Sequence, residues 1–281
     1  MKNCHSRLQI VRCCPRFWAQ YLLILAYWGL VAVDAWAQDS QESLSQEVAN
    51  PVADLISIPL QNNLNGNQGA FDRNTNILHI QPVVPLLGGQ LITRTIFPIV
   101  SIPDFASESG IASSGLADIV FTGFYVPKDQ PFIWGAGPVI EIPAGGSERG
   151  TEKWSLGPSV VGLVQSEDWT LGILVNNVWS IAGDSERADV NRMFINLFIT
   201  RQLGNGWYVN TAPIITSDWK ARGDDRWIVP LGAGGGKVLF VGKLPLNVQT
   251  QMYYNVVRPD FGPEWQWRLQ LALLLPTSMF K

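Results

Sequence analysis

The chain has 281 residues and a formal charge of −3, which falls to −6 when residues 1–37 are left out, so nucleic acid is not an expected partner. Although 47% of the residues are hydrophobic, no uninterrupted apolar run of about 18 residues follows position 37. The sequence beyond that position therefore offers no candidate for a membrane-spanning helix.

The first 37 residues have the layout of a secretory signal peptide. Four basic residues between positions 2 and 16 precede an apolar stretch at 17–33, and a short segment ending at Ala37 follows it. A permanent membrane anchor is the alternative, but the apolar stretch is at the lower limit of what spans hydrocarbon. We expect a signal peptide at residues 1–37 that is cleaved after Ala37.

The cysteines and the next segment define what the processed chain contains. Cys4, Cys13 and Cys14 all lie in the leader, so no disulfide or thiolate metal ligand is expected afterwards. Residues 38–50 are polar and lack a core-forming pattern, which predicts a short periplasmic lead-in. Residues 51–281 are expected to form one domain.

Beyond residue 50, short segments in which apolar and polar residues alternate recur along the chain. The last one, at 264–275, alternates over a length that exceeds the five or six residues usual in soluble sheets, and this favours a tilted membrane strand. The sequence therefore predicts an all-β fold, a transmembrane antiparallel up-and-down β-barrel of about 12 strands. The segments lie near 52–61, 76–85, 90–100, 116–126, 132–142, 153–165, 169–180, 190–201, 207–217, 227–238, 245–256 and 264–275.

The links between these segments alternate in length. Outer-membrane barrels have short periplasmic turns and longer external loops, so the alternation places both chain ends on the periplasmic side. The acidic residues of the longer links could bind Ca²⁺ or lipopolysaccharide-bridging cations weakly, or simply be solvated. The short links are 86–89, 127–131, 166–168, 202–206 and 241–243, and the longest are 61–75, 101–115, 143–152 and 181–189.

Tryptophan side chains gather at the expected strand ends. Trp prefers the two bilayer interfaces, where its ring is half buried and its N–H stays wet, so the pattern favours aromatic girdles over a soluble core. The residues are Trp154, Trp169, Trp179, Trp207, Trp227, Trp265 and Trp267.

The polar faces of the strands supply candidates for the barrel lumen. They include charges of both signs, which would either filter solutes in a narrow conduit or pair with one another to fill a closed interior. Inward glycines on two strands would either leave space beside the wall or relieve crowding. The lumen-lining candidates are His79, Gln81, Arg94, Asp118, Glu141, Asn196, Gln249, Gln251, Glu264, Arg268 and Gln270.

An enzymatic function finds little support in the sequence. His79 is the one histidine after the leader, and no serine stands two positions away to share its strand face, so a serine–histidine hydrolase would need a serine from another strand. Without cysteine and with a single histidine, no metal or cofactor site is expected. The glycine-rich segment at 232–237 lacks the spacing of a phosphate-binding loop.

Several motifs along the mature chain resemble the bacterial outer-membrane proteins of the phenol-degradation MetA-pathway family. The resemblance implies a barrel of this size, a role in moving small molecules, and no catalytic residues. The chain departs from many such proteins by continuing past Leu275 without a terminal aromatic residue. The motifs are Asn50-Pro51-Val52-Ala53-Asp54-Leu55-Ile56-Ser57, Gln61-Asn62-Asn63, Gln81-Pro82-Val83-Val84-Pro85, Arg94-Thr95, Gly115-Leu116-Ala117-Asp118-Ile119, Trp134-Gly135-Ala136-Gly137-Pro138, Glu152-Lys153-Trp154, Asn176-Asn177-Val178-Trp179-Ser180 and Pro263-Glu264-Trp265.

Three functional hypotheses remain from the sequence. The first is a passive outer-membrane channel or uptake transporter for small solutes, with apolar or aromatic solutes suggested by the family resemblance alone. The second is a plugged structural or surface-interaction barrel, and the third is a lipid-modifying enzyme that uses His79. The expected partners are outer-membrane lipid, lipopolysaccharide and a small-molecule solute.

Overall fold

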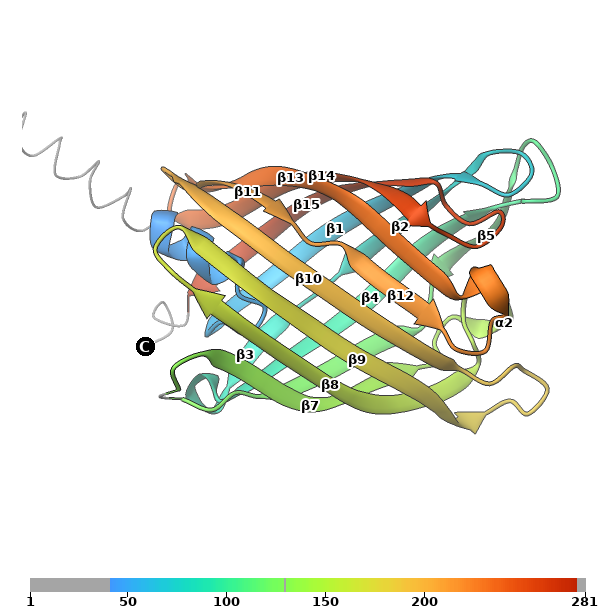
Figure 1. Ribbon diagram of the computed structural model, residues 1–281, viewed down its shortest axis with the longest axis horizontal. Helices are drawn as coiled ribbons and strands as arrows, with labels where there is room; N and C mark the ends of the chain where they lie inside the picture. The colour runs from blue at the N-terminus through green and yellow to red at the C-terminus, as the bar shows by residue number, and fades with distance from the viewer. Residues whose placement is uncertain (1–40, 129, 277–281) are drawn as a thin grey trace, which may run out of the picture. The chain divides into compact units, whose positions relative to one another are not determined.

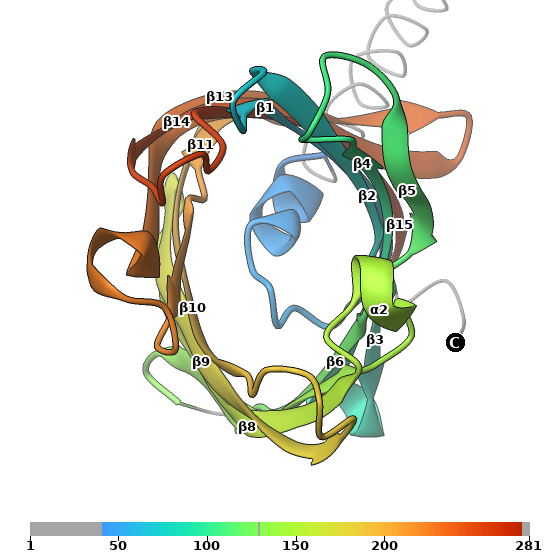
Figure 2. The same cartoon turned by 90° about the vertical axis from the view of Figure 1, so that its right-hand side faces the viewer.

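The computed structural model describes residues 41–128 and 130–276. The predicted signal peptide at 1–37 and its cleavage site lie outside these residues. Within them, antiparallel strands join edge to edge into one closed barrel (Figure 1, Figure 2). None of the helices in the described residues is long and apolar enough to cross a bilayer.

The barrel consists of strands with four short helical segments beside them. A helix at 41–48 comes first, and the 3-10 segments η1 (Leu87–Gly89) and η2 (Gly223–Arg226) and the helix α2 (Gly146–Arg149) lie in links. The strands are β1 (Leu55–Gln68), β2 (Arg73–Ile80), β3 (Val83–Leu86), β4 (Leu91–Pro103), β5 (Ile111–Leu116), β6 (Ile119–Tyr125), β7 (Ile133–Ile142), β8 (Lys153–Gln165), β9 (Trp169–Gly183), β10 (Asn191–Gly204), β11 (Trp207–Thr211), β12 (Ile214–Asp218), β13 (Trp227–Val241), β14 (Leu244–Val257) and β15 (Trp265–Pro276).

The wall closes because the last strand pairs with the first. β15 runs antiparallel to β1 from Leu55 opposite Pro276 to Gly66 opposite Trp265. Three of the full-height ribbons of the wall, which we call staves, are interrupted, so the fifteen strands of the described residues make twelve staves. The predicted all-β antiparallel barrel of twelve strands is confirmed.

Two of the three interrupted staves break at a proline. Pro82 separates β2 from β3, and Pro213 separates β11 from β12. Proline has no N–H to donate to the ladder, so it ends strand pairing where it occurs. The break before Pro213 leaves the backbone of Ala212 free for side chains: its N–H bonds to the Tyr253 hydroxyl at 2.9 Å, and its carbonyl accepts from Arg268 at 3.1 Å.

Side chains alternate between the two faces of the wall as the sequence predicts. On β15, Trp267, Leu269 and Leu271 point outward and are 44–46% exposed, whereas Arg268 and Ala272 point inward and are buried. The backbone polar groups of the wall are paired between neighbouring strands, which is the condition for crossing a bilayer with strands. The barrel therefore has an apolar outer face and a mostly polar inner face.

The links confirm the predicted alternation with one correction. Short turns lie at one end of the barrel, which we call the turn end, and the longer links, with α2 and η2, lie at the other, the loop end (Figure 1). The expected long loop at 61–75 is wrong, because β1 continues to Gln68 and β2 starts at Arg73. The ladder extends there because Asn62 and Asn76 exchange side-chain amide hydrogen bonds of 3.0 Å.

The N-terminal helix at 41–48 lies inside the barrel, near the turn end (Figure 1, Figure 2). Leu44 is buried against Leu55 of β1, Val238 of β13 and Leu274 of β15. Although residues 38–50 lack a core-forming pattern in the sequence, Leu44 of this helix belongs to the core. Its presence also explains why Leu274 interrupts the alternation of β15: the wall facing the helix is apolar.

Hydrogen bonds fix the same helix to the turn end of the wall. The Ser45 hydroxyl donates to Gln202 Oε1 at 2.8 Å, and Gln202 Nε2 donates to the Ser45 carbonyl at 3.2 Å. Gln46 Nε2 donates to the Glu167 carbonyl at 2.7 Å, while Gln165 Nε2 donates to the Gln46 carbonyl at 3.0 Å. The helix is thus held by apolar packing against β1, β13 and β15 and by polar contacts with β8, β10 and the turn after β8.

Candidate functional site

The barrel encloses a cavity of about 250 Å³ next to the N-terminal helix. Residues 47–51 close it on one side, and side chains of β1, β2, β4, β10, β14 and β15 form much of the surrounding wall. Seven of the predicted lumen residues lie on its surface, so strand parity identified much of this lining. They are His79, Gln81, Arg94, Asn196, Gln249, Arg268 and Gln270.

Arg268 is the centre of a hydrogen-bond network on one side of the cavity. Its Nε donates to Asn63 Oδ1 at 3.1 Å, and its Nη1 donates to Gln251 Oε1 at 3.1 Å. Its Nη2 donates to Gln266 Oε1 at 3.0 Å, and its guanidinium lies 5.0 Å from the centre of the Tyr253 ring. The charge of Arg268 is thus solvated by neutral amides and an aromatic face.

The network continues from β1 to β4. Asn63 Nδ2 lies 3.5 Å from His79 Nδ1, and Arg94 donates to Gln81 Oε1. His79 and Gln81 share the inner face of one interrupted stave, so both arginines lie on the same polar side of the lumen. Within the described residues, neither Arg94 nor Arg268 forms an ion pair with a carboxylate.

The opposite side of the cavity is mixed. Phe194 and Phe198 on β10 and Ile214 on β12 face the polar staves. The polar residues Asn196, Thr200 and Asn210 stand beside them on the lining. Phe198 belongs to a buried apolar cluster that fills the lumen beside the cavity towards the turn end. The cavity therefore combines one cationic, amide-rich wall with a second wall in which aromatic and aliphatic side chains alternate with polar ones.

Glu141 is the one predicted lumen residue that pairs with an opposite charge. Its carboxylate accepts from Arg192 Nη2 at 2.8 Å, which joins β7 to β10 across the lumen. The Glu141 side chain is 14% exposed and that of Arg192 44% exposed, so the pair is partly wet. The pair stabilises the interior on the loop-end side of the cavity and does not neutralise Arg94 or Arg268.

Three further candidates do not line the cavity, and for Asp118 and Glu264, which lie in links, the expectation of lumen-facing strand residues is corrected. Asp118 holds a link in place, accepting from the Thr151 backbone N–H at 2.7 Å and its hydroxyl at 2.8 Å. Glu264 lies before β15, and the bond from Asn67 Nδ2 at 3.0 Å lowers its pKa. Gln251 stands on the inner face of β14 as predicted, buried beside Arg268, from which its Oε1 accepts a hydrogen bond. Strand parity is a poor guide for Asp118 and Glu264 because neither lies within a strand.

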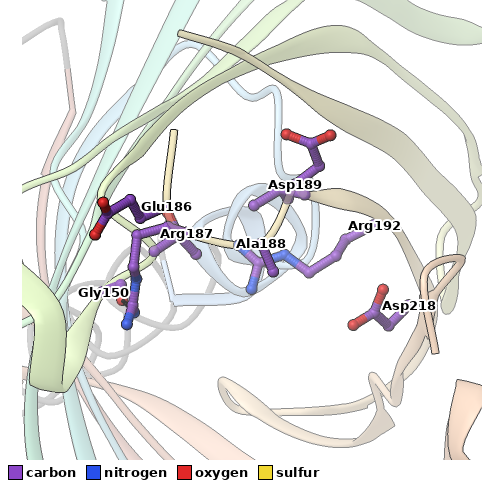
Figure 3. A pocket seen from close by; sticks show the side chains of 9 residues that line it. Gly150, Glu186, Arg187, Ala188, Asp189, Arg192 and Asp218 are labelled. Atoms are coloured by element: carbon purple, nitrogen blue, oxygen red, sulfur yellow. Dashed lines mark hydrogen bonds between the residues drawn. The ribbon is translucent and has the colours of Figure 1, made fainter. Parts of the chain in front are cut away.

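The loop end has a second hollow of about 420 Å³ (Figure 3). Charges of both signs surround it, and most are paired: Lys153 Nζ lies 3.5 Å from Asp189 Oδ1, and Arg187 Nε lies 3.3 Å from Glu152 Oε2. Arg192 reaches it from β10 and Asp218 from β12. This charged vestibule stands in line with the Glu141 pair, at the loop-end entrance of the lumen.

Sequence reasoning missed two contributions to the site. Asn63 stands on the inner face of β1 and bridges His79 and Arg268, and its parity with Gln61 could have identified it. The N-terminal helix was missed because only Leu44 and Val48, one helical turn apart, mark an apolar side on it. In the described part of the chain, no three His, Cys, Asp or Glu side chains are grouped to hold a metal.

His79 makes no contact of the kind that a hydrolase requires. Its ring is near the Asn63 amide, and no serine hydroxyl is hydrogen-bonded to it in the residues that the structure describes. Geometry is the first requirement for a general base. The enzymatic alternative therefore has no geometric support here.

Comparison with known proteins places the fold. No family model matches the chain, and no curated protein does. A solved structure, the COG4313 outer membrane channel from Pseudomonas putida F1, overlays with a TM-score of 0.55 and 17% identity, covering 79% of this chain and 94% of that one. The two chains share the fold of a closed antiparallel outer-membrane β-barrel.

Two further structures extend the comparison. The NanC porin overlays with a TM-score of 0.50 and 10% identity, covering 78% of this chain and 98% of that one. The outer membrane phospholipase A from Escherichia coli reaches a TM-score of 0.39 with 11% identity over 82% of this chain and 97% of that one, which is too remote to bear on His79. The likeness to bacterial outer-membrane channels supports the expected location in the outer membrane.

Proposed function

We propose that this chain is a passive outer-membrane channel or uptake transporter for small solutes. The observation that carries the proposal is the pair of lumen arginines, Arg94 and Arg268, which face a hollow and have no carboxylate partner among the residues that the structure describes. Keeping charges in a barrel interior without opposite charges is unfavourable for stability, so a purely structural interior would have paired them. Ionisable groups inside membrane proteins commonly mark solute pathways.

Two observations bear on the class of solute. The motifs quoted above resemble the phenol-degradation MetA-pathway family, and the apolar wall formed by Phe194 and Phe198 is compatible with apolar or aromatic solutes. The outer face would contact lipid and, on the outer leaflet, lipopolysaccharide. The arginines argue for a filter over the alternative in which lumen charges only fill space.

A plugged barrel is the second candidate, because the N-terminal helix occupies the lumen near the turn end. Leu44 packs into the wall, and Ser45 and Gln46 are hydrogen-bonded to it. A helix held in this way either narrows a conduit or closes it. The two candidates differ in whether solute passes through the folded barrel while the helix is in place.

Permeation through the purified protein tests the proposal. We expect the processed chain, reconstituted in planar bilayers and in liposomes, to give stepwise conductance and faster liposome swelling in small solutes than lipid alone. Heat-modifiable gel mobility confirms that the barrel is folded in the same samples. Folded protein that gives neither conductance nor swelling above the lipid blank would contradict the channel and favour the plugged barrel.

A further inference from the structure

We infer that the lumen cavity binds a small carboxylate with an apolar body, its carboxylate against Arg94 and Arg268 and its body against Phe194 and Phe198. The inference rests on the proposed function, because it names the class of solute that the channel would select. It concerns binding as well as transport, so the two can be tested apart.

The first support is the hydrogen-bonding capacity that Arg94 leaves unused. A guanidinium presents several N–H donors in a planar fork, which matches the two oxygens of a carboxylate. Within the described residues, the guanidinium of Arg94 forms one hydrogen bond, to Gln81 Oε1. Its remaining N–H groups beside the cavity are therefore free to donate hydrogen bonds to a carboxylate.

The second support is the balance of charge around the cavity. Arg94 and Arg268 both line it, and all hydrogen-bond acceptors of Arg268 are neutral amide or backbone oxygens. Among the described residues Glu47 is the one acidic side chain on the lining, and it forms no ion pair with either arginine. An anionic solute would supply the missing opposite charge, whereas a cation would be repelled.

The third support is the apolar wall on the other side. Phe194, Phe198 and Ile214 face the arginines across the hollow, and burial of an apolar surface against them stabilises a bound molecule in proportion to its area. An inorganic anion or a sugar phosphate could not use this wall. The arrangement fits a molecule that is charged at one end and apolar at the other.

The size of the cavity limits the solute. Sites for drug-sized ligands usually measure roughly 300–1,000 Å³. This cavity measures about 250 Å³, so it suits a single ring or a short branched chain with one carboxylate. Benzoate is a suitable probe of this class, and benzyl alcohol and benzylammonium have a similar body without the negative charge.

Titration calorimetry of the folded, processed chain in detergent tests binding directly. We expect benzoate to bind and benzyl alcohol and benzylammonium to bind at least about tenfold more weakly, since a hydrogen bond to a charged group typically contributes this much. Arg94→Gln should weaken benzoate binding on the order of tenfold, and Arg94→Lys should weaken it less because the charge remains. Arg201→Gln is the matched control, since Arg201 lies outside the barrel over the Trp169 ring.

Ion selectivity in planar bilayers provides the second readout. Reversal potentials in a potassium chloride gradient should show anion preference in the wild type and in Arg201→Gln, and a smaller preference in Arg94→Gln. Equal affinity for benzoate and benzyl alcohol in the wild type would overturn the inference even if Arg94→Gln did not fold. So would conductance without anion preference. Benzoate binding by a protein that conducts nothing would support the site and contradict the channel.

Discussion

Arginines inside this barrel are stabilised in two different ways. Arg192 is paired with Glu141 at 2.8 Å in a partly wet region towards the loop end. Arg94 and Arg268 are bonded to amide and carbonyl oxygens deeper in the lumen, where solvation by water is weaker. Neutral acceptors leave the positive potential of a guanidinium largely uncompensated. The lumen is therefore positively charged beside the cavity, whereas on the loop-end side of the cavity the positive and negative charges are paired.

Replacing Glu141 tests this division at the level of one residue. Glu141→Gln removes a carboxylate from the lumen and leaves Arg192 without its partner, so we expect stronger anion preference in the reversal potential than in the wild type. Loss of a partly exposed pair should destabilise the barrel by only about 1 kcal/mol. Glu108→Gln, on the exposed link between β4 and β5, makes the same charge change outside the lumen and should have no effect. A shift towards cations after Glu141→Gln would disprove this charge arrangement.

A second prediction at this scale concerns the N-terminal helix and pH. Enclosure by the barrel, which takes Glu47 partly out of bulk water, and the carboxylate of Asp54 both raise the pKa of Glu47 above 4.5. The unfavourable charged form predominates above the raised pKa and is protonated as the pH falls through it. Docking of the helix should therefore tighten on acidification, and conductance should fall.

The measurement is single-channel conductance as the pH is lowered on the turn side. Glu47→Gln should give the low-pH conductance at every pH, because its side chain is always neutral. Glu42→Gln, on the same helix, serves as the control and should retain the wild-type pH dependence. A conductance that rises on acidification, or an unchanged dependence in Glu47→Gln, would contradict a role for this carboxyl.

At the scale of elements, the helix at 41–48 lies in the interior without being part of the wall (Figure 2). It is joined to β1 by only a few residues and packs through a single buried leucine, Leu44, with Val48 beside it. Such limited packing is easier to release than any stave, because each stave is hydrogen-bonded along both edges. Opening of the turn end thus depends on this helix.

Leu44→Asp tests the helix as a plug. A carboxylate among Leu55, Val238 and Leu274 would be buried without a partner, and loss of the leucine alone should weaken docking by about 2–5 kcal/mol. We expect higher conductance with unchanged heat-modifiable mobility, because no strand is altered. Leu87→Asp, at a leucine that is 75% exposed in a turn, should leave conductance unchanged. Equal conductance in wild type and Leu44→Asp would mean that the helix does not restrict flow.

The sequence predicts staves well and the helix poorly, for physical reasons. In β15 successive side chains point alternately to lipid and to the lumen. These two surroundings alone impose an alternation of apolar and polar residues that is visible in the local sequence. The helix at 41–48 has a mostly polar sequence, and only Leu44 and Val48 mark the side that packs against the apolar part of the wall. The residues that contact this helix come from strands far along the chain, so the local sequence of the helix does not predict where it docks.

The inward glycines of β13 show the same limit. Strand parity placed them on the inner face but could not say whether they leave space. A Cβ at Gly234 would collide with the Thr250 carbonyl of β14, and one at Gly236 would collide with the Tyr208 hydroxyl. The hydroxyl donates to Asn247 at 2.7 Å, so the ring of Tyr208 occupies this part of the lumen. These glycines therefore permit close packing; they do not widen the conduit.

At the scale of the whole molecule, apolar residues on neighbouring staves form a continuous outer band. Leu271 of β15 lies opposite Leu60 of β1 and Val248 of β14, and the three are 39–44% exposed. Exposed tryptophans stand near both ends of the wall, with Trp154 at the loop end and Trp169 at the turn end. This is the distribution that hydrocarbon between two interfaces requires.

The outer band makes a prediction that depends on depth. An arginine on the lipid face of a barrel costs about 2–4 kcal/mol at the bilayer midplane and about 0–1 kcal/mol near the interface. Leu271 stands mid-strand, whereas Val256 stands near the loop end of β14, and both side chains point outward. We therefore expect Leu271→Arg to lower the free energy of unfolding from lipid vesicles, measured by gel mobility in denaturant, by about 2–4 kcal/mol. Val256→Arg should lower it far less, because its guanidinium can reach water. In a barrel surrounded by water both substitutions would be tolerated alike, so equal effects at the two depths would contradict a lipid-embedded wall.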